Sequence, residues 1–496
     1  MAQEQTEKIK NSGRSLIYQL EGRPSLKIAF PLGLQHVLSM FIGNLAPVLV
    51  LAGITNAATG EMIITPEQRM LMVQCCMFAS GVTTFIQLYP LKLGPYQIGA
   101  GLPIVMGTAF AFVPTLRTLG AEFGINIVLG SIMVGGVVEI LMGFFIKPLK
   151  RFFPPLVIGA VLMTIGMHLL PVGVQYFAGG AAAEANAGIA ENLIAQGKEV
   201  PSNVAALAAR YASWQNLTIG FSVFIVILLL QRFGKGMFKI SAILIGIAIG
   251  YIIAIGLGEV NFNQVTNAAY ISIPLPLSIK PEFRLEAILA IAAIYVVSGL
   301  ETMGNINGIT VAAFDREATS REMSGAVMAD AAGSMFASLF NTLPNTAFGQ
   351  NAGIVAMTRV VNKFCIATGA ALLILAGFIP KIGAFFAAMP YSVLGGAVVT
   401  VFAMIMLNGI KLIAKAGFSD RNLLILAITF GIAYAIGDNK LLVAHLPGWL
   451  QFVFKDTTVA VCIFSIVLNL IFPPSNEEKA ILKKAQEEAA LEDLKS

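Results

Sequence analysis

The feature that most constrains this chain is a series of apolar runs, each long enough to cross a lipid bilayer as a helix. A bilayer core about 30 Å thick requires about 20 apolar residues per helical span. Only 12% of the residues are charged, about half the share found in soluble domains, so the polar surface of a soluble protein cannot be built. The sequence therefore predicts an all-α polytopic membrane protein. Twelve full runs lie at residues 28–54, 69–90, 124–147, 151–170, 216–231, 238–258, 285–303, 324–342, 363–380, 389–409, 421–437 and 457–473.

Two further segments, 97–114 and 346–360, are apolar but short, and Gly, Pro and polar residues interrupt them. Counting both gives fourteen crossings. The basic residues support this count, because cytoplasmic loops are enriched in Lys and Arg. With both termini inside, the tails and inner loops hold 23 of the 32 basic residues, and removing either short segment inverts every later loop. We therefore predict fourteen spans in the cytoplasmic (inner or plasma) membrane, with both termini in the cytoplasm.

The two short segments are the third and tenth of the fourteen, so each is the third crossing of a seven-span half. Because seven is odd, the second half is inverted relative to the first. Gly/Pro-interrupted short segments at matching positions indicate the central site of a transporter. The free N–H groups of a helix that ends at mid-membrane can bind a polar ligand there. We expect the breaks at Gly101–Phe110 and at Pro344–Gly353.

Polar and ionisable residues inside predicted spans are costly, and they indicate function. Glu301 and Asp330 are candidates for binding a substrate or a proton, or for locking two helices together. Gln350 and Asn351 begin the tenth segment, where they either bind a ligand or cap the half-helix. His36, in the first span, either contacts substrate or forms a packing hydrogen bond.

The remaining polar residues and the cysteines do not indicate a further binding or catalytic site. Glu139, in the fourth span, is expected to be structural. The four cysteines lie in apolar runs without the spacing of metal ligands, so we expect no metal and no cofactor. Motifs such as HExxH and GxSxG are absent from the sequence, which argues against a membrane-embedded enzyme.

The run QNAGIVAMTR, from Gln350 to Arg359, resembles the signature of the nucleobase–ascorbate transporter family (nucleobase:cation symporter-2). That signature is Gln, Glu or Pro, then Asn, any residue, Gly, four variable residues and Thr. The surrounding sequence NTLPNTAFGQNAGIVAMTR is similar to the xanthine and uric acid permease branch, and Asp330 precedes Gln350 by twenty residues, as in xanthine permeases. The resemblance covers all fourteen spans. Shorter matches are QH at 35–36, GLPIVMGTAFAF at 101–112, ETMGN at 301–305 and PYSVLGGA at 390–397.

The resemblance implies two domains, a homodimer and a secondary active transporter with elevator-type alternating access. A core domain would comprise spans 1–4 and 8–11, and a gate domain spans 5–7 and 12–14, with substrate held between them. The transporter would import a purine nucleobase, xanthine or uric acid, by proton symport. The predicted ranges are 1–27 and 474–496 for the cytoplasmic tails, 28–147 and 261–380 for the core, and 148–260 and 381–473 for the gate.

If the roles known for the family are assigned to the matching motif positions of this chain, Glu301 and Gln350 would hydrogen-bond the edge of the base. Phe110 would stack on its ring, the backbone N–H groups around Ala109 and Phe110 would contact it, and Asn351 would support the site. The chemistry is consistent with these roles. A purine dione presents N–H donors beside C=O acceptors; a carboxylate accepts from N–H, and a Gln amide both donates and accepts. A wrong substrate would leave buried groups unpaired.

The resemblance further implies that His36 and Asp330 organise the core and that a carboxylate couples transport to protons. One position departs from the family: four residues after Glu301, relatives often carry Asp or His, whereas this chain has Asn305. Because Asn cannot titrate, Glu301 and Asp330 remain the candidates for coupling.

Several alternatives stay open. A transporter of the sulfate permease type shares the seven-plus-seven architecture, but Glu301 beside Gln350 argues against an anionic substrate. Within the family, uracil is the second candidate substrate, and Gln350 in place of Glu favours xanthine or urate. The sequence does not separate xanthine, urate and guanine, or proton from sodium coupling. The expected partners are the base, the coupling ion, membrane lipid and a second copy of the chain, with no nucleic acid.

Overall fold

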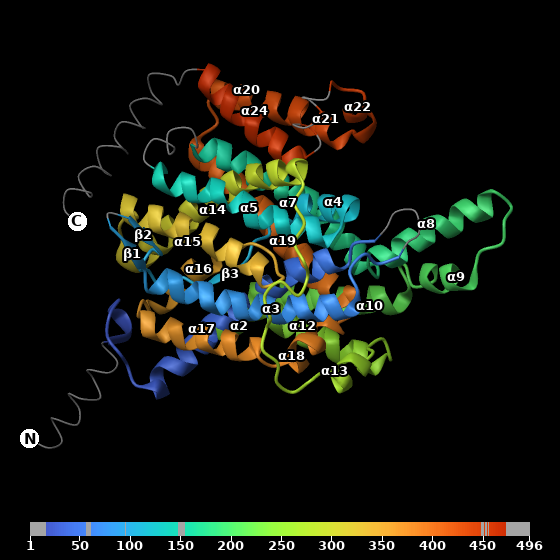
Figure 1. Ribbon diagram of the computed structural model, residues 1–496, viewed down its shortest axis with the longest axis horizontal. Coiled ribbons are helices and arrows are strands. Elements are labelled where there is room, and N and C mark those ends of the chain that lie inside the picture. Colours follow the sequence, from blue (N-terminus) through green and yellow to red (C-terminus); the bar gives the residue numbers. More distant parts are fainter. Residues whose placement is uncertain are drawn as a thin grey trace, which may run out of the picture.

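The computed structural model describes residues 16–55, 61–94, 96–146, 154–447, 451, 454 and 456–472. The predicted C-terminal tail, 474–496, lies outside them. Most of the described residues form helices that run roughly along one direction (Figure 1). The hairpin of β1 (Leu91–Leu93) and β2 (Tyr96–Ile98) lies at one end of the molecule, and α8 (Ala181–Ala195) and α9 (Ser202–Ala208) project from the other. These are called the β1 end and the α8 end below.

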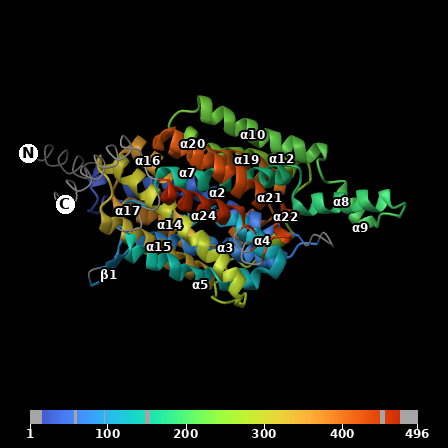
Figure 2. The ribbon, with the colours of Figure 1, turned by 90° about the horizontal axis from the view of Figure 1, so that it is seen from above.

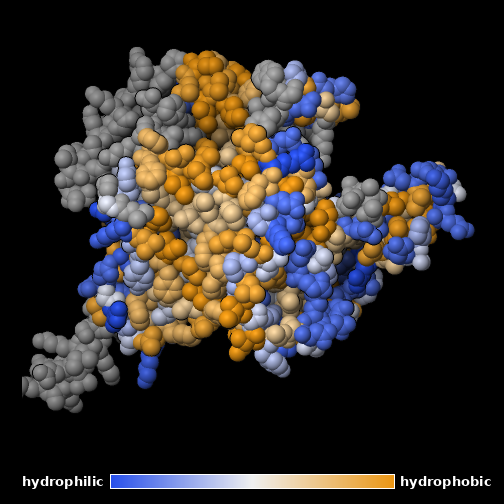
Figure 3. Space-filling view, viewed as in Figure 1, coloured by the Kyte–Doolittle hydropathy of each residue, from blue (hydrophilic) through white to orange (hydrophobic). Residues whose placement is uncertain are grey.

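Eight segments of the described chain are long and apolar enough to cross a membrane. The bent pair α17 (Lys363–Gly377) and α18 (Pro380–Ala387) is a ninth candidate, with an angle of 83° between its helices. Hydrophobic residues cover the middle of the visible face, and hydrophilic residues gather toward the ends and over α8 and α9 (Figure 3). The chain is therefore a multi-pass membrane protein. The eight segments are α2 (Leu26–Ala52), α3 (Pro66–Leu88), α5 (Ile125–Phe144), α7 (Pro155–Phe177), α10 (Trp214–Phe233), α14 (Leu285–Phe314), α19 (Tyr391–Ala416) and Asp420–Gly437.

Each of the twelve predicted apolar runs overlaps a helix. The remaining runs correspond to α12 (Ala242–Gly256), α15 (Ser320–Leu339) and α24 (Thr457–Ile471), and the run at 421–437 is built from α20 (Asp420–Ile428), the π-helical η3 (Thr429–Tyr434) and α21 (Ala435–Asp438). The count of fourteen crossings stays a prediction. The short helix η1 (Leu16–Tyr18) precedes the first span, and α11 (Met237–Ile240), α13 (Asn263–Asn267) and α22 (Lys440–Ala444) lie between later spans.

Neither short segment is a continuous helix. Each is a three-residue strand followed by a short helix: β3 (Met106–Thr108) precedes α4 (Val113–Phe123), and β4 (Asn345–Ala347) precedes α16 (Gln350–Thr358). The two strands pair antiparallel. The sequence predicted the interruptions but not this pairing. Extended backbone at membrane depth must satisfy its N–H and C=O groups within the protein, and the pairing does so.

Polar side chains of the surrounding helices bond the strand pair. The Oδ1 atom of Asn44 on α2 accepts from the Thr108 N–H at 2.8 Å and from the Ser80 hydroxyl at 2.8 Å. On the other strand, the Ser334 hydroxyl donates to the Asn345 carbonyl at 2.9 Å, and the Asn345 N–H lies 3.0 Å from the same hydroxyl oxygen. The strand pair is thus fixed to α2, α3 and α15.

The helices form two groups, seen from above in Figure 2. In the first group α5 packs between α14 and α15, and α17 packs against α2 and α3. In the second group α19 packs along α7 and against α10 and α12, and α24 packs against α7. The strand pair belongs to the first group. The groups meet where α14 contacts α7 and α24, and where α4 contacts α7.

Two connections differ from the sequence prediction. The region 171–215, which lies between the predicted runs at 151–170 and 216–231, contains the end of α7 and the helices α8 and α9. The helix α18 was not predicted between the runs at 363–380 and 389–409. It turns sharply from α17 because a proline at its start cannot continue the preceding helix.

A close contact in the strand region gives a stability prediction. A Cβ atom on Gly107 would lie 2.3 Å from Cε2 of Phe348, whose opposite edge is already packed against Gly43. We expect Gly107→Ala to lower the stability by about 1–3 kcal/mol through overpacking, measured as a lower melting temperature of the purified protein in detergent. Gly188→Ala is the control, because a Cβ atom added to this exposed glycine of α8 would have no atom within 4 Å. Equal melting temperatures for the two variants would contradict the prediction.

Candidate functional site

Asp330 of α15 is the most heavily bonded of the predicted site residues. Its carboxylate accepts hydrogen bonds from the hydroxyls of Thr302 and Thr346, at 2.9 Å for the latter, from the Ala347 N–H at 3.2 Å and from Nε2 of Gln87 at 3.1 Å. These donors lie on α14, β4 and α3. A fully buried carboxylate with four donors is well satisfied as an anion. Asp330 therefore holds the strand pair and three helices together.

Glu301 lies on α14 beside Thr302, and its surroundings differ from those of Asp330. The side chain is partly exposed, and no hydrogen bond or ion pair to another described residue is found for it. Its neighbours Leu300 and Met303 pack in a cluster with Val157 of α7. Glu301 thus presents a carboxyl group that has no partner among the described side chains, on a helix that contacts both groups.

Phe110 follows β3 at the same boundary. Its ring meets the ring of Phe402 edge to face, with centroids 5.8 Å apart and an interplanar angle of 81°. Phe402 is on α19, in the second group. The backbone N–H of Ala109 donates to the Pro344 carbonyl at 2.8 Å. The contact of the N–H groups around Ala109 and Phe110 with a base stays a prediction.

The start of α16 holds the remaining residues. Asn351 is fully buried and faces His36 of α2, and the Nδ1 atom of His36 and both polar side-chain atoms of Asn351 lack a partner of good geometry among the described residues. Asn305 donates to the Ala347 carbonyl at 2.8 Å, so this non-titrating residue braces β4. Gln350 begins α16, but its side chain lies outside the described part of the structure.

The structure thus brings Asp330, Asn305, Asn351 and His36 around the strand pair, with Glu301 and Phe110 at the boundary between the groups. Sequence reasoning missed the bracing residues Asn44 and Gln87 and the aromatic partner Phe402. The rule that singled out Asp330, namely that a polar residue within an apolar span is costly, applies equally to Asn44 and Gln87. Phe402 carries no such signal, because an aromatic residue in a lipid-spanning helix is unremarkable by composition.

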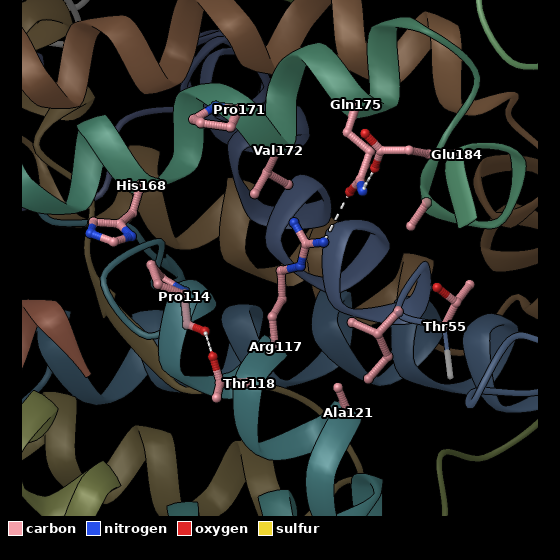
Figure 4. Close-up of a pocket in the computed structure, with 12 residues that line it drawn as sticks. Thr55, Pro114, Arg117, Thr118, Ala121, His168, Pro171, Val172, Gln175 and Glu184 are labelled. Atoms are coloured by element: carbon pink, nitrogen blue, oxygen red, sulfur yellow. Dashed lines mark hydrogen bonds between the residues drawn. The ribbon is translucent and has the colours of Figure 1, made fainter. Parts of the chain in front are cut away.

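A crevice of about 420 Å³ lies between α4, α7 and α8 near the α8 end (Figure 4). Arg117 of α4 reaches across it and donates through Nη2 to Oε1 of Gln175 on α7 at 3.0 Å, and Nε2 of Gln175 donates to Glu184 of α8. Pro114, four residues after Phe110, also lines the crevice. The crevice therefore lies between the two helix groups on the α8 side of Phe110, and the bond from Arg117 to Gln175 joins the groups across it.

Fold and site together define a membrane transport protein. The solved transmembrane domain of a cyanobacterial bicarbonate transporter, BicA, has the same fold, with a TM-score of 0.51 and 15% identity over 86% of this chain and 97% of that one. The model of the permease family Xan_ur_permease matches residues 27–438. The chain belongs to this family, the nucleobase–ascorbate transporters.

Two relatives from Bacillus subtilis illustrate the membership. The xanthine permease is 32% identical over 92% of this chain and 96% of its own length. The uric acid permease PucJ is 32% identical over 89% of this chain and 92% of its own length. These relatives are permeases rather than enzymes, and each is matched over most of its length.

The bonding of Asp330 predicts that Asp330→Asn destabilises the protein. The new NH2 group replaces one of the two oxygens and cannot accept, so either Nε2 of Gln87, bonded to Oδ1, or the Ala347 N–H, bonded to Oδ2, loses its acceptor. Each buried group left unsatisfied costs about 1–3 kcal/mol. We expect a lower melting temperature and less protein in the membrane than for wild type. Asp315→Asn, at a side chain 82% exposed, is the matched control and should be neutral; a melting curve for Asp330→Asn like that of the control would refute the bracing role.

Proposed function

We propose that the protein is a secondary active transporter that imports a purine nucleobase, xanthine or uric acid, by proton symport. The observation that carries the proposal is the carboxyl of Glu301, which has no partner among the described residues and lies beside a strand pair that Asp330 holds in place. A carboxylate accepts from the N–H groups of a purine dione, and the amide of Gln350 both donates and accepts along the same edge. The names of the relatives, a xanthine permease and a uric acid permease, support this class of substrate.

The site can be divided by role. Glu301 and Gln350 would bind the edge of the base, and Phe110 would stack on its ring. Asn351, with His36, would support the start of α16. Glu301 is the proposed proton carrier, because Asp330 is already saturated with donors. A proton on Glu301 neutralises the carboxyl group while the loaded site moves through a low-dielectric interior.

Transport would proceed by an elevator motion of the core domain, 28–147 and 261–380, against the gate domain, 148–260 and 381–473. The division of the described helices into two groups supports these ranges. The site residues Glu301 and Phe110 sit on the first group and face the second, so a movement of one group would carry them with it. The antiparallel pairing of β3 with β4 supports two inverted seven-span halves. Fourteen spans, cytoplasmic termini and a homodimer complete the proposal.

An anion transporter is the second candidate, since BicA shares the fold. The likeness shows the fold alone, and function depends on the site built on it. An anion at this site would meet the carboxyl of Glu301 close to Asp330, and none of the groups that bond Asp330 is a Lys or Arg. A nucleobase with N–H donors fits this charge better. Uracil remains the alternative base within the family.

The first test is Glu301→Gln. The amide presents an NH2 group toward the base and cannot carry the proton, so we expect uptake of radiolabelled xanthine below about a tenth of wild type, because a missing partner in a polar site discriminates strongly. Protein in the membrane should be unchanged. Glu286→Gln, at an exposed side chain in the first turn of the same helix, should transport normally. Near-normal uptake by Glu301→Gln would remove this residue from the site.

The same uptake assay tests the substrate and the coupling ion. Xanthine, urate and uracil are compared with and without a protonophore, and with sodium replaced by choline. We expect xanthine or urate to be taken up and the protonophore to abolish accumulation. Uptake of uracil alone, or dependence on sodium, would contradict the proposal.

Gln350→Glu tests recognition of the base edge. It replaces a group that both donates and accepts by one that only accepts when ionised. We therefore expect a different order of inhibition of uptake by unlabelled xanthine, urate, guanine and uracil. An unchanged order would argue against contact between residue 350 and the base.

A further inference from the structure

The polar contacts between the two helix groups are distributed unevenly along the molecule. Every side-chain hydrogen bond that joins a described residue of the first group, with its strands and α4, to α7, α19, α24 or the residues directly before these helices lies toward the α8 end. The bonds are Arg69 to Tyr391 and Met389, Tyr176 to Val50, Arg117 to Gln175, and Thr115 to Asp456. These involve the end of α2, the start of α3, α4, the end of α7 and the starts of α19 and α24.

Arg69 and Tyr176 make the most extensive of these contacts. Nη1 of Arg69 donates to the hydroxyl of Tyr391 at 3.0 Å, and the guanidinium lies 4.7 Å from the centre of the same ring. Tyr176 is fully buried, donates to the Val50 carbonyl at 2.6 Å and packs edge to face on Tyr391. A cation on an aromatic face and a buried phenol hydrogen bond both stabilise close packing. Gly53 allows the approach, because a Cβ there would meet the Tyr176 hydroxyl at 2.2 Å.

The β1 end lacks such bonds among the described residues. From Glu301, the same side of α14 continues toward the β1 end through Gly304, Gly308 and Val311, and these three are exposed. An added Cβ would meet nothing within 4 Å at Gly304 or at Gly353 of α16. Because the two helix groups are bonded to each other at the α8 end and not at the β1 end, the site between them is closed toward the α8 end.

We propose that these contacts form an outer gate, consisting of Arg69, Thr115 and Arg117 in the first group and Tyr176, Gln175, Tyr391 and Asp456 in the second. The gate holds the groups together at the α8 end, and its bonds must break before a base can enter from that side. This inference rests on the proposed transport function, in which the α8 end is extracellular. The strength of the gate sets the fraction of molecules that open outward.

If these contacts form a gate, removing them should increase the fraction of molecules that are open at the α8 end. A single hydrogen bond that exists only in the closed state shifts the ratio of open to closed molecules by about two- to tenfold when it is lost. Tyr391→Phe removes the hydroxyl that accepts from Arg69 but keeps the ring, and Tyr176→Phe removes only the bond to Val50. Arg69→Gln removes both the cation and its hydrogen bonds to the second group.

The test uses a cysteine at Ile54, which lines the crevice of Figure 4, follows Gly53 at the Tyr176 contact and is only 3% exposed while the gate is closed. The four native cysteines are buried, so I54C reports access when intact cells are treated with a membrane-impermeant maleimide. We expect Y391F, Y176F and R69Q each to raise the labelling rate of I54C by about two- to tenfold. Tyr295→Phe is the matched control, because this fully buried tyrosine donates to the Ile132 carbonyl at 3.0 Å within the first group. Its labelling rate should equal that of I54C alone.

Unchanged labelling in all three gate variants would overturn the gate, and so would an equal increase in the control. Labelling needs no substrate, so this outcome is separate from a failure of the proposed function, which is seen as absence of nucleobase uptake by the wild type. Uptake of xanthine by the gate variants provides a second measurement. A larger outward-open fraction lowers the apparent KM for external xanthine by up to the same factor, and an unchanged KM in variants that transport would also count against the gate.

Discussion

The structure depends on satisfying extended backbone at membrane depth. Water is absent there, so every N–H and C=O group of a segment that leaves the helical conformation needs a partner within the protein. The three-residue strands β3 and β4 provide partners for each other, and Asn44, Ser334 and Asp330 bond the pair from the surrounding helices. Without this pairing, neither α4 nor α16 could begin inside the protein, and no polar site could form at their starts.

The same arrangement explains why the site lies between two groups of helices. The strand pair fixes Phe110 and the start of α16 in the first group, while Phe402 faces Phe110 from the second. Glu301 is carried on α14, which contacts both groups. A ligand bound there would touch both groups, so a relative movement of the groups would change its exposure. The side-chain bonds toward the α8 end and the exposed glycines toward the β1 end would give such a movement a direction.

The fold itself does not select the substrate. A bicarbonate transporter shares it at 15% identity, whereas the permeases at 32% identity are named for xanthine and uric acid. The difference lies in a few polar groups on a common scaffold. In this chain the groups near the strand pair are carboxyl and amide side chains, which suit a neutral heterocycle with N–H donors. Asn305 is a further example of a change in one polar group on this scaffold. It hydrogen-bonds β4 at a position where relatives often carry a titrating side chain.

The membrane-spanning character, the positions of the twelve apolar helices and the two interruptions can be predicted from the amino-acid sequence, because these follow from local composition and from Gly and Pro. The sequence also singles out Asp330 and Glu301 as polar groups in apolar spans. In contrast, the pairing of β3 with β4, the bond from the Ala109 N–H to Pro344 and the contact of Phe402 with Phe110 are seen only in the folded protein. Three-residue strands have no periodicity to detect, and each of these contacts joins residues far apart in the chain, so only the folded packing brings them together.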